Sequence, residues 1–182
     1  ITEEDIPVLL SVGKDNVYIW EKGETRLHEN EAAEILREMC QGEYMHPTPV
    51  KEGKIELVAD IDGLLKVDSD KMKKINGMGE LMIASRHGNF AVEKGDKLAG
   101  TRIIPLVIER EKMEQAKAVC EGEPILELKP FVHKKVGIVT TGNEVYYHRI
   151  EDTFTPVIKE KLAEYDTEVI GQEICNDDHE KI

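Results

Sequence analysis

The chain has 182 residues, of which 40% are hydrophobic and 34% are charged, and its formal net charge is −13. This length and apolar content suffice for one large or two small packed domains and exclude a disordered chain. The negative charge opposes a broad nucleic-acid interface, because phosphate backbones are bound by clustered Lys and Arg. It remains compatible with an anionic ligand held by backbone N–H groups of one loop.

The amino-terminal part predicts short helices and short strands. A helix is expected over residues 2–12, with acidic residues in its first turn and Gly13 at its end. Residues 17–20 predict a strand, and residues 29–39 carry apolar side chains at helical spacing before Gly42. We therefore expect a helix, a strand and a second helix in this order.

A β-hairpin is predicted next. Ile55, Leu57 and Ala59 alternate with polar residues, residues 62–63 supply a turn, and residues 64–67 resume the apolar pattern. Two strands separated by such a tight turn would pair with each other.

The rest of the first 132 residues continues the mixture. The pattern predicts a helix at 68–75, a strand at 81–84, two strands within 91–108 joined at a hairpin tip at 94–96, a helix at 109–121 and a strand at 125–132. Pro105 implies an edge or a bulge in the second of the two strands. Short strands interspersed with short helices predict an α+β domain over residues 1–132.

Residues 133–182 have a different pattern, that of strand, helix and strand. Val136, Ile138 and Val139 predict a strand buried on both faces of a parallel sheet, and a second strand is expected over residues 167–174. With a helix between them, the two strands form a right-handed βαβ unit and should be parallel neighbours.

The helix between these strands is predicted to pack on the sheet through one apolar stripe. Its members fall at spacings of three and four residues: Phe154, Val157, Ile158, Leu162 and Tyr165. The start is expected at Asp152 or at Thr155, and Thr155 as the cap would leave Pro156 at the first helical position.

Ligands of such units bind outside the carboxyl ends of the strands, so the loops at 140–150 and 175–178 are the candidate site. Without further information, residues 140–144 are also explained as an ordinary turn, and 177–178 as a helix cap. Residues 177–182 resemble a helix that is just starting. Two parallel strands with one helix leave a sheet face uncovered, so we expect this chain to be a fragment of a longer protein.

At this point the residues carry a family likeness. The segment VGIVTTGNEV, followed by HRIEDTF, a helix, EVIGQ and the acidic pair at 177–178, resembles the start of the molybdopterin-binding domain of the molybdenum-cofactor biosynthesis family. Molybdopterin molybdotransferases, the gephyrin E domain, molybdopterin adenylyltransferases and competence-damage proteins share this domain. The resemblance implies that residues 133–182 are the first βαβ unit of a doubly wound, mainly parallel α/β domain that is truncated here.

The resemblance also implies a set of cofactor-binding residues. Residues 141–144 match the family's T-G-D/N-E motif, and 152–153 match its Asp-Ser/Thr segment. The candidates are Thr140, Thr141, Gly142, Asn143, Glu144, Asp152, Thr153, Asp177 and Asp178. Gly142 permits close backbone approach, nearby hydroxyls can donate, and a helix amino terminus favours phosphate. The family's later Gly-Gly-x-Ser loop is absent, so we expect half a site.

Asn143 stands where many relatives have Asp, which removes a charge and places a metal or acid–base role for this position in doubt. The residues themselves predict no metal site. Scattered carboxylates near His28 are most simply solvated, and Cys40, Cys120 and Cys175 have no CxxC spacing, which also argues against a disulfide framework and fits a reducing cytoplasm.

Three functions are compatible with this resemblance. The first is a molybdopterin-binding protein that inserts molybdate into adenylylated molybdopterin with Mg²⁺. The second is a non-catalytic carrier or sensor of molybdopterin, and the third is an amidase of the competence-damage group, which would need a further domain. Family members are often dimers or trimers. No apolar run approaches 18 residues and no signal peptide is recognisable, so we expect a cytoplasmic protein with no membrane span.

Overall fold

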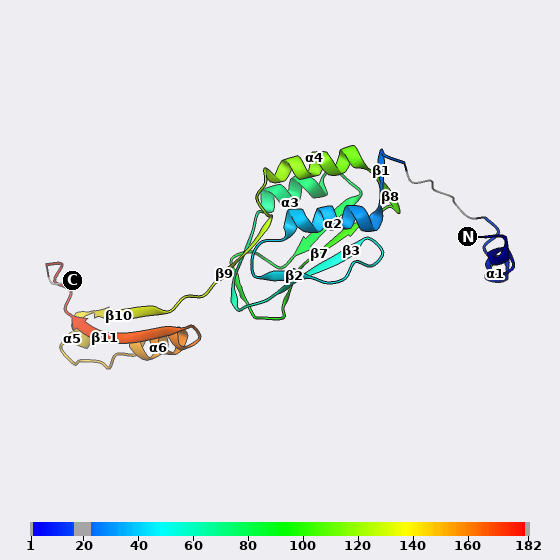
Figure 1. Cartoon of the computed structure of the whole chain (residues 1–182). Coiled ribbons are helices and arrows are strands. Elements are labelled where there is room, and N and C mark those ends of the chain that lie inside the picture. The colour runs from blue at the N-terminus through cyan, green and yellow to red at the C-terminus, as the bar shows by residue number, and fades with distance from the viewer. Residues whose placement is uncertain (1, 17–22, 181–182) are drawn as a thin grey trace.

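The structure is a computed structural model that describes residues 2–16 and 23–180 (Figure 1). The strand predicted at 17–20 lies outside these residues. The chain begins with a 3-10 turn, η1 (Glu3–Asp5), followed by helix α1 (Ile6–Ser11). The Asp5 carboxylate accepts hydrogen bonds from the N–H and the hydroxyl of Thr2, at 2.7 and 3.1 Å, so Thr2 is the N-cap of this segment and one of its acidic residues closes the first turn.

A four-stranded antiparallel sheet forms the centre of residues 26–130. Its strands, in spatial order, are β2 (Met45–Pro47), β3 (Lys54–Ala59), β7 (Lys97–Ile103) and β5 (Leu81–Ser85). Strand β3 alternates as predicted, because Ile55, Leu57 and Ala59 are buried while Lys54 and Glu56 belong to the other face.

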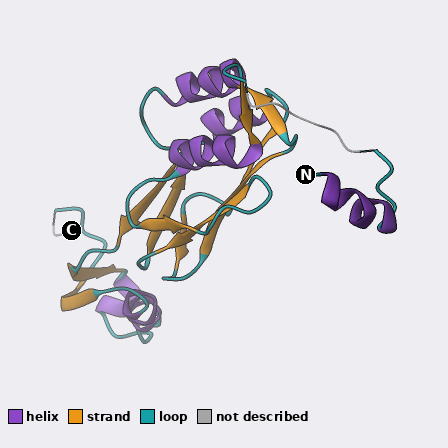
Figure 2. Cartoon of the chain, turned by 45° about the vertical axis from the view of Figure 1, so that its right-hand side comes forward, coloured by secondary structure: helices purple, strands orange, loops and turns teal. Residues whose placement is uncertain are grey.

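Three helices lie on one side of this sheet (Figures 1 and 2). They are α2 (Glu29–Cys40), α3 (Ser69–Asn76) and α4 (Arg110–Cys120). Helices α2 and α3 lie against the strands of the sheet, and α4 is packed on those two helices. The Asp68 carboxylate accepts from the N–H of Lys71 at 2.9 Å, which confirms the predicted start of α3. The hydrophobic core lies between these helices and the sheet, and it contains Cys40 and Cys120. Burial raises the pKa of the Cys40 thiol to about 12.

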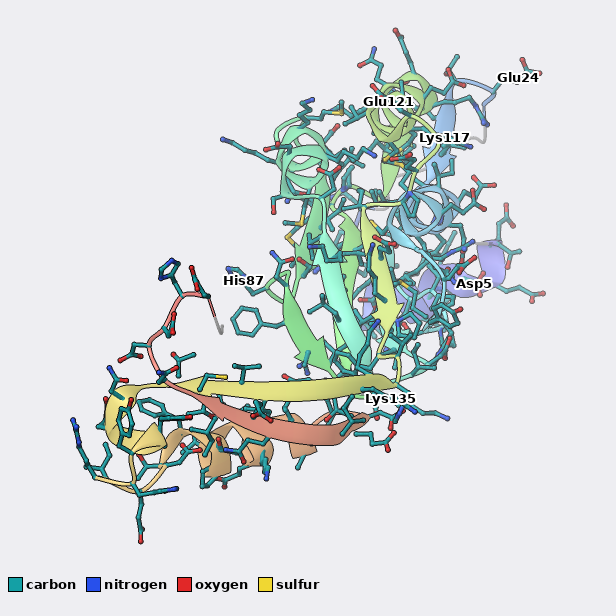
Figure 3. All side chains as sticks on the ribbon, turned by 90° about the vertical axis from the view of Figure 1, so that its left-hand side faces the viewer. Asp5, Glu24, His87, Lys117, Glu121 and Lys135 are labelled. Atoms are coloured by element: carbon teal, nitrogen blue, oxygen red, sulfur yellow. The ribbon has the colours of Figure 1, made fainter. Side chains whose placement is uncertain are left out.

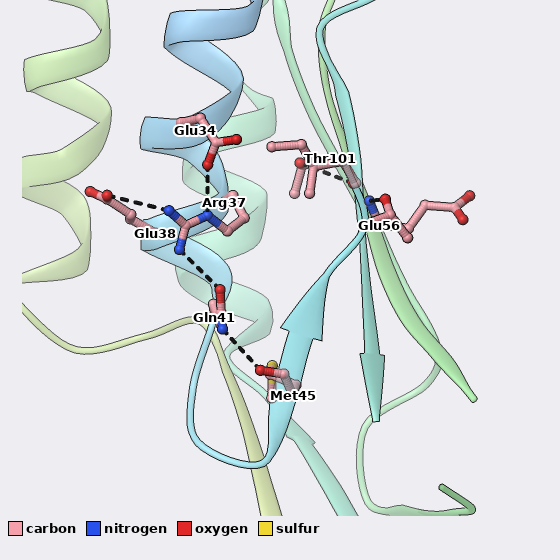
Figure 4. Close-up of polar contacts among 9 residues, drawn as sticks. Glu34, Arg37, Glu38, Gln41, Met45, Glu56 and Thr101 are labelled. Atoms are coloured by element: carbon pink, nitrogen blue, oxygen red, sulfur yellow. Dashed lines mark hydrogen bonds and ion pairs between the residues drawn. The ribbon is translucent and has the colours of Figure 1, made fainter. Parts of the chain in front are cut away.

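Helix α2 is tied to the sheet by a chain of polar contacts (Figure 4). The Arg37 guanidinium donates to Glu34, Glu38 and Gln41, and the Gln41 amide donates to the carbonyl of Met45 in β2 at 2.9 Å.

No helix in the described part of the chain has the length and apolarity needed to cross a membrane.

The predicted hairpin over residues 55–67 is wrong. Strand β4 (Gly63–Val67) does not pair with β3 but belongs to a second antiparallel sheet, of order β6 (Phe90–Val92), β4 and β9 (Leu126–Pro130). Both edges of β3 are filled by β2 and β7, so no position is left for β4. The N–H of Asp60 donates to the carbonyl of Tyr44, which continues the pairing of β3 with β2 by one more residue.

The hairpin tip predicted at 94–96 is also wrong, because β6 and β7 lie in different sheets and these residues connect them. The apolar run after this connection divides at Pro105. Strand β7 ends at Ile103, and the chain then forms a short strand that pairs with an early one; the pair consists of β1 (Arg26–His28) and β8 (Val107–Glu109).

The last part of the chain forms the expected βαβ unit. Its elements are β10 (Lys134–Thr141), α5 (Asn143–Tyr146), α6 (Phe154–Ala163) and β11 (Thr167–Cys175). Strands β10 and β11 are parallel, which confirms the predicted pairing, and their register shifts between Val136 and Gly137. Helix α6 lies along one side of the two strands (Figure 3). The domain boundary expected at residues 132–133 stays a prediction.

Burial in this unit differs from the expectation. The strand predicted to be buried on both faces has Val139 59% exposed, and Ile170 of β11 is 63% exposed. The predicted helical stripe is wrong, because four of its five residues are exposed and only Leu162 is half-buried, whereas Thr155, which is not in the stripe, is buried. The exposed members are Phe154, at 74%, and Val157, Ile158 and Tyr165. The physical reason is that one helix covers one face of a two-stranded sheet, and Thr155 and Leu162 lie on the covered side.

The start of α6 is set by Asp152. Its carboxylate accepts from the N–H groups of Phe154 and Thr155 at 2.9 and 3.1 Å. Asp152, one of the two predicted starts, therefore caps the helix, and Pro156 lies at the third helical position.

Candidate functional site

The two loops at the carboxyl ends of β10 and β11 lie against each other. The Gly142 N–H donates to the carbonyl of Cys175 at 3.2 Å. The Asn143 N–H donates to Asp177 Oδ2 at 3.2 Å, and the Asp177 N–H donates in return to Asn143 Oδ1 at 3.5 Å. The structure thus brings together three of the sequence-predicted site residues, at the end of the strands away from Lys135 (Figure 3).

The turn after β10 leaves backbone donors open. Gly142 has φ 144°, a conformation that favours glycine, and a Cβ at this position would lie 3.1 Å from Glu144 Oε1. The N–H groups of Glu144 and Val145 have no hydrogen-bond acceptor among the residues that the structure describes. Thr141 and Glu144 are exposed, and neither side chain is hydrogen bonded within residues 2–16 and 23–180. The turn can therefore offer two amides and a hydroxyl to a ligand.

A second cluster of polar side chains lies beneath the turn, between α6 and the sheet. The Thr155 hydroxyl donates to the Asp152 carboxylate, and the Gln172 amide donates to both Asp152 Oδ2 and Thr155 Oγ1 at 2.8 Å. Thr140 Oγ1 lies 3.0 Å from Thr155 Oγ1. Because the proton of Thr155 goes to Asp152, Thr140 is the donor in this last bond.

These hydrogen bonds lower the pKa of the Asp152 carboxyl from its ordinary value, the one from the Thr155 hydroxyl most of all. Asp152 is thus held ionised at the start of α6. It occupies the amides of Phe154 and Thr155, so a ligand phosphate would have to compete with this carboxylate for the helix amino terminus. Thr153 is exposed, and its side chain makes no capping hydrogen bond.

The loop after β11 contains the two remaining candidate carboxylates and an unsatisfied amide. Asp178 is half-buried, and its Oδ1 accepts from the N–H of Glu180 at 3.1 Å. The described residues 176–180 form turns and bends, so they do not show the helix start that the sequence predicted over 177–182. Asn176 Oδ1 is buried and has no hydrogen-bond donor in the described part of the chain. Leaving a buried acceptor unpaired costs free energy. The Asn176 side-chain oxygen is therefore a further hydrogen-bond acceptor in this loop.

Sequence reasoning missed five residues at or near these loops. Thr155, which is buried, and Gln172, which is exposed, complete the polar cluster around Asp152, and only the strand register brings Gln172 to it. Tyr146 and Tyr147 form an edge-to-face pair with centroids 5.1 Å apart, and the Arg149 guanidinium lies 5.4 Å from the Tyr147 ring. In the sequence, only the closeness of aromatic and basic residues at 146–149 could have indicated that these two tyrosines and the arginine lie together.

The site combines donors with acceptors. Backbone amides and Arg149 suit an anionic or carbonyl group, whereas the carboxylates of Asp177 and Asp178 suit N–H groups of a ligand. Over residues 2–16 and 23–180, no group of three or more His, Cys, Asp or Glu side chains is placed to hold a metal ion. The arrangement therefore fits a ligand that carries both an anionic part and N–H donors.

A comparison with protein families identifies this segment. Residues 137–182 match the family model described as "Probable molybdopterin binding domain", which confirms the resemblance seen in the sequence. The matched residues run from β10 through both loops of the site. No curated protein and no solved structure matches the chain.

Proposed function

We propose that the chain binds molybdopterin through the loops at 140–150 and 175–178. The observation that carries this proposal is the pairing of Asn143 with Asp177 at the carboxyl ends of two parallel strands, inside the segment that matches the family. Open α/β sheets bind their ligands in this position.

The ligand's two kinds of polar group have counterparts in the site. Molybdopterin carries a phosphate, which would accept from the open amides of Glu144 and Val145 and from the Thr141 hydroxyl. Arg149 adds a positive charge to the same loop. Its backbone N–H donates to the carbonyl of Glu144 at 2.8 Å, and its guanidinium lies 5.4 Å from the Tyr147 ring. The N–H groups of the pterin ring would donate to the carboxylate of Asp177.

The polar cluster around Asp152 has a positioning role in this proposal. Asp152 and Thr155 fix the hydroxyl of Thr140, the last buried residue of β10 before the turn. A rigid end of β10 keeps Gly142 and the amides after it in place, which lowers the entropic cost of binding. Asp152 thus contributes through the start of α6, whereas the exposed side chain of Thr153 makes no hydrogen bond there.

The family is one of molybdenum cofactor biosynthesis, and the reaction that we propose is insertion of molybdate into adenylylated molybdopterin. Mg²⁺ is commonly held by one or two carboxylates together with substrate phosphates. Within the described residues, no three His, Cys, Asp or Glu side chains are placed to hold a metal ion by themselves. A cytoplasmic location and a dimeric or trimeric state remain predictions.

Anaerobic titration calorimetry with molybdopterin tests the assignment. Thr141→Ala and Asp177→Ala should each weaken binding by at least about 10-fold, because each removes a hydrogen-bonding partner of the ligand. Glu160→Ala, on the exposed side of α6, is the matched surface control and should retain the parent affinity. Unchanged affinity in both loop variants would remove the site from these loops.

A second assay separates binding from reaction. Adenylylated molybdopterin and molybdate are supplied together, and formation of molybdenum cofactor is followed. Product that forms with the parent chain and is lost in Thr141→Ala would support the insertion reaction, whereas binding without product would show that this chain acts by itself only as a binder of molybdopterin.

A further inference from the structure

A second polar site lies on the four-stranded sheet, on the face opposite the helices. It is a hollow of about 460 Å³, and the residues that line it include Thr48, Lys51, Lys54, Glu56, Lys97 and Arg102. Figure 4 shows Glu56 pointing away from α2, whereas Thr101 of the neighbouring strand points toward that helix. The hollow therefore belongs to the open face of the sheet, and none of its lining residues lies in the segment 137–182.

The pairing register of β3 and β7 brings basic residues of the two strands together on one face of the sheet. Lys54 of β3 lies directly opposite Arg102 of β7, and Glu56 lies opposite Gly100, so these side chains share one face. A Cβ at Gly100 would meet nothing within 4 Å, which leaves open space beside Glu56.

Glu56 organises two of the cations. Its Oε1 lies 2.8 Å from Lys54 Nζ, and its Oε2 lies 2.7 Å from Lys97 Nζ. These hydrogen bonds, that from Lys54 first, lower the pKa of Glu56 to about 2. Glu56 therefore stays ionised at neutral pH and holds two ammonium groups at the edge of the hollow.

The other two cations are available to a ligand. Neither Lys51 nor Arg102 has a side-chain hydrogen bond or an ion pair within the described ranges 2–16 and 23–180. Glu52 also lines the hollow, so four cationic side chains meet two carboxylates there. This local excess of positive charge contrasts with the net charge of −13 for the whole chain.

A neutral donor completes the hollow. Thr48 Oγ1 accepts from the N–H of Glu56 at 3.0 Å, so the hydroxyl proton of Thr48 points elsewhere and can be donated. The Thr48 N–H also donates to the Glu56 carbonyl at 2.8 Å, which fixes this residue against β3. The hydroxyl is thus held in place by the backbone.

We propose that this hollow binds the phosphate group of a small phosphorylated ligand, with Arg102 and Lys51 as the principal contacts. A guanidinium pairs with two phosphate oxygens at once, and an ammonium adds a point charge. The volume falls in the range of about 300–1,000 Å³ that small-molecule sites occupy. The strongly negative chain repels an extended polyanion, so a nucleic acid is the less suitable occupant.

Calorimetry of the 182-residue chain with pyrophosphate at low ionic strength tests this site. Saturable binding is expected, and Arg102→Gln and Lys51→Gln should each weaken it by at least about 10-fold. Arg102→Lys should recover part of the loss, because it restores the charge without the planar fork. Lys73→Gln, an exposed change of the same charge on α3, is the matched control and should bind as the parent chain does.

Three outcomes would overturn the proposal. The first is the absence of saturable binding in a chain whose circular dichroism shows it to be folded. The second is an equal loss in Lys73→Gln, which would mean that pyrophosphate responds only to overall charge. The third is tighter binding of a single-stranded oligonucleotide than of pyrophosphate, with the same dependence on Arg102, which would assign the face to nucleic acid.

Discussion

Residues 26–130 and residues 134–175 have similar apolar patterns in sequence but bury them to different extents. In the first region, Leu36 and Ile55 are completely buried between three helices and a four-stranded sheet. In the second, Val145 is the single fully buried large apolar residue among those described, and Phe154 is 74% exposed. The difference shows that periodicity predicts which element forms, whereas burial depends on how many layers surround it.

What replaces apolar packing in the second region is hydrogen bonding. The buried side chains between α6 and β10 are Thr140 and Thr155, and both belong to the cluster around Asp152. One region therefore rests on an apolar core, and the other holds its strand ends in place through a polar network next to the candidate site.

The largest effect that tests this contrast is expected from a matched pair of isoleucine truncations. Ile55→Ala should lower the free energy of unfolding by about 2–5 kcal/mol, because it opens a cavity in the core. Ile170→Ala removes the same atoms from a strand position that is 63% exposed, and should cost less than about 1 kcal/mol. Chemical denaturation followed by circular dichroism measures the free energy of unfolding of both variants. Equal losses of stability would contradict the difference in burial between the two regions.

A smaller effect is expected from the polar network. Thr155→Val removes the hydroxyl that contacts Thr140, Asp152 and Gln172, and should destabilise the βαβ unit by about 1–3 kcal/mol. The exposed neighbouring change Thr153→Val provides the control. Amide hydrogen exchange should show faster exchange of β10 and β11 in the first variant alone. The same rates in both variants would mean that the network does not hold the unit.

The sequence allowed much of this organisation to be predicted. The Asp68 cap identified α3, and the βαβ pattern predicted parallel strands with adjacent loops. The hairpin prediction failed because the turn at 62–63 says nothing of which strands already occupy the edges of β3. The exposure of Phe154 was missed because several faces of an apolar helix can satisfy one periodic pattern.

The site residues that were missed depend on tertiary register. Gln172 reaches Asp152 because the register of β10 and β11 shifts at Val136, which sets it opposite Ile138. Arg102 and Lys54 likewise meet only because β3 and β7 pair in one register. Such contacts join residues that are distant in the chain, so no local sequence pattern predicts them.

The measurement that tests the central claim most directly is nuclear magnetic resonance of the ¹⁵N-labelled chain during addition of molybdopterin. We predict the largest shifts at the amides of Glu144 and Val145, with smaller ones at Asn143 and Asp177. Shifts confined to other parts of the chain, or no shifts at all in the folded protein, would contradict the assignment of these loops as the binding site.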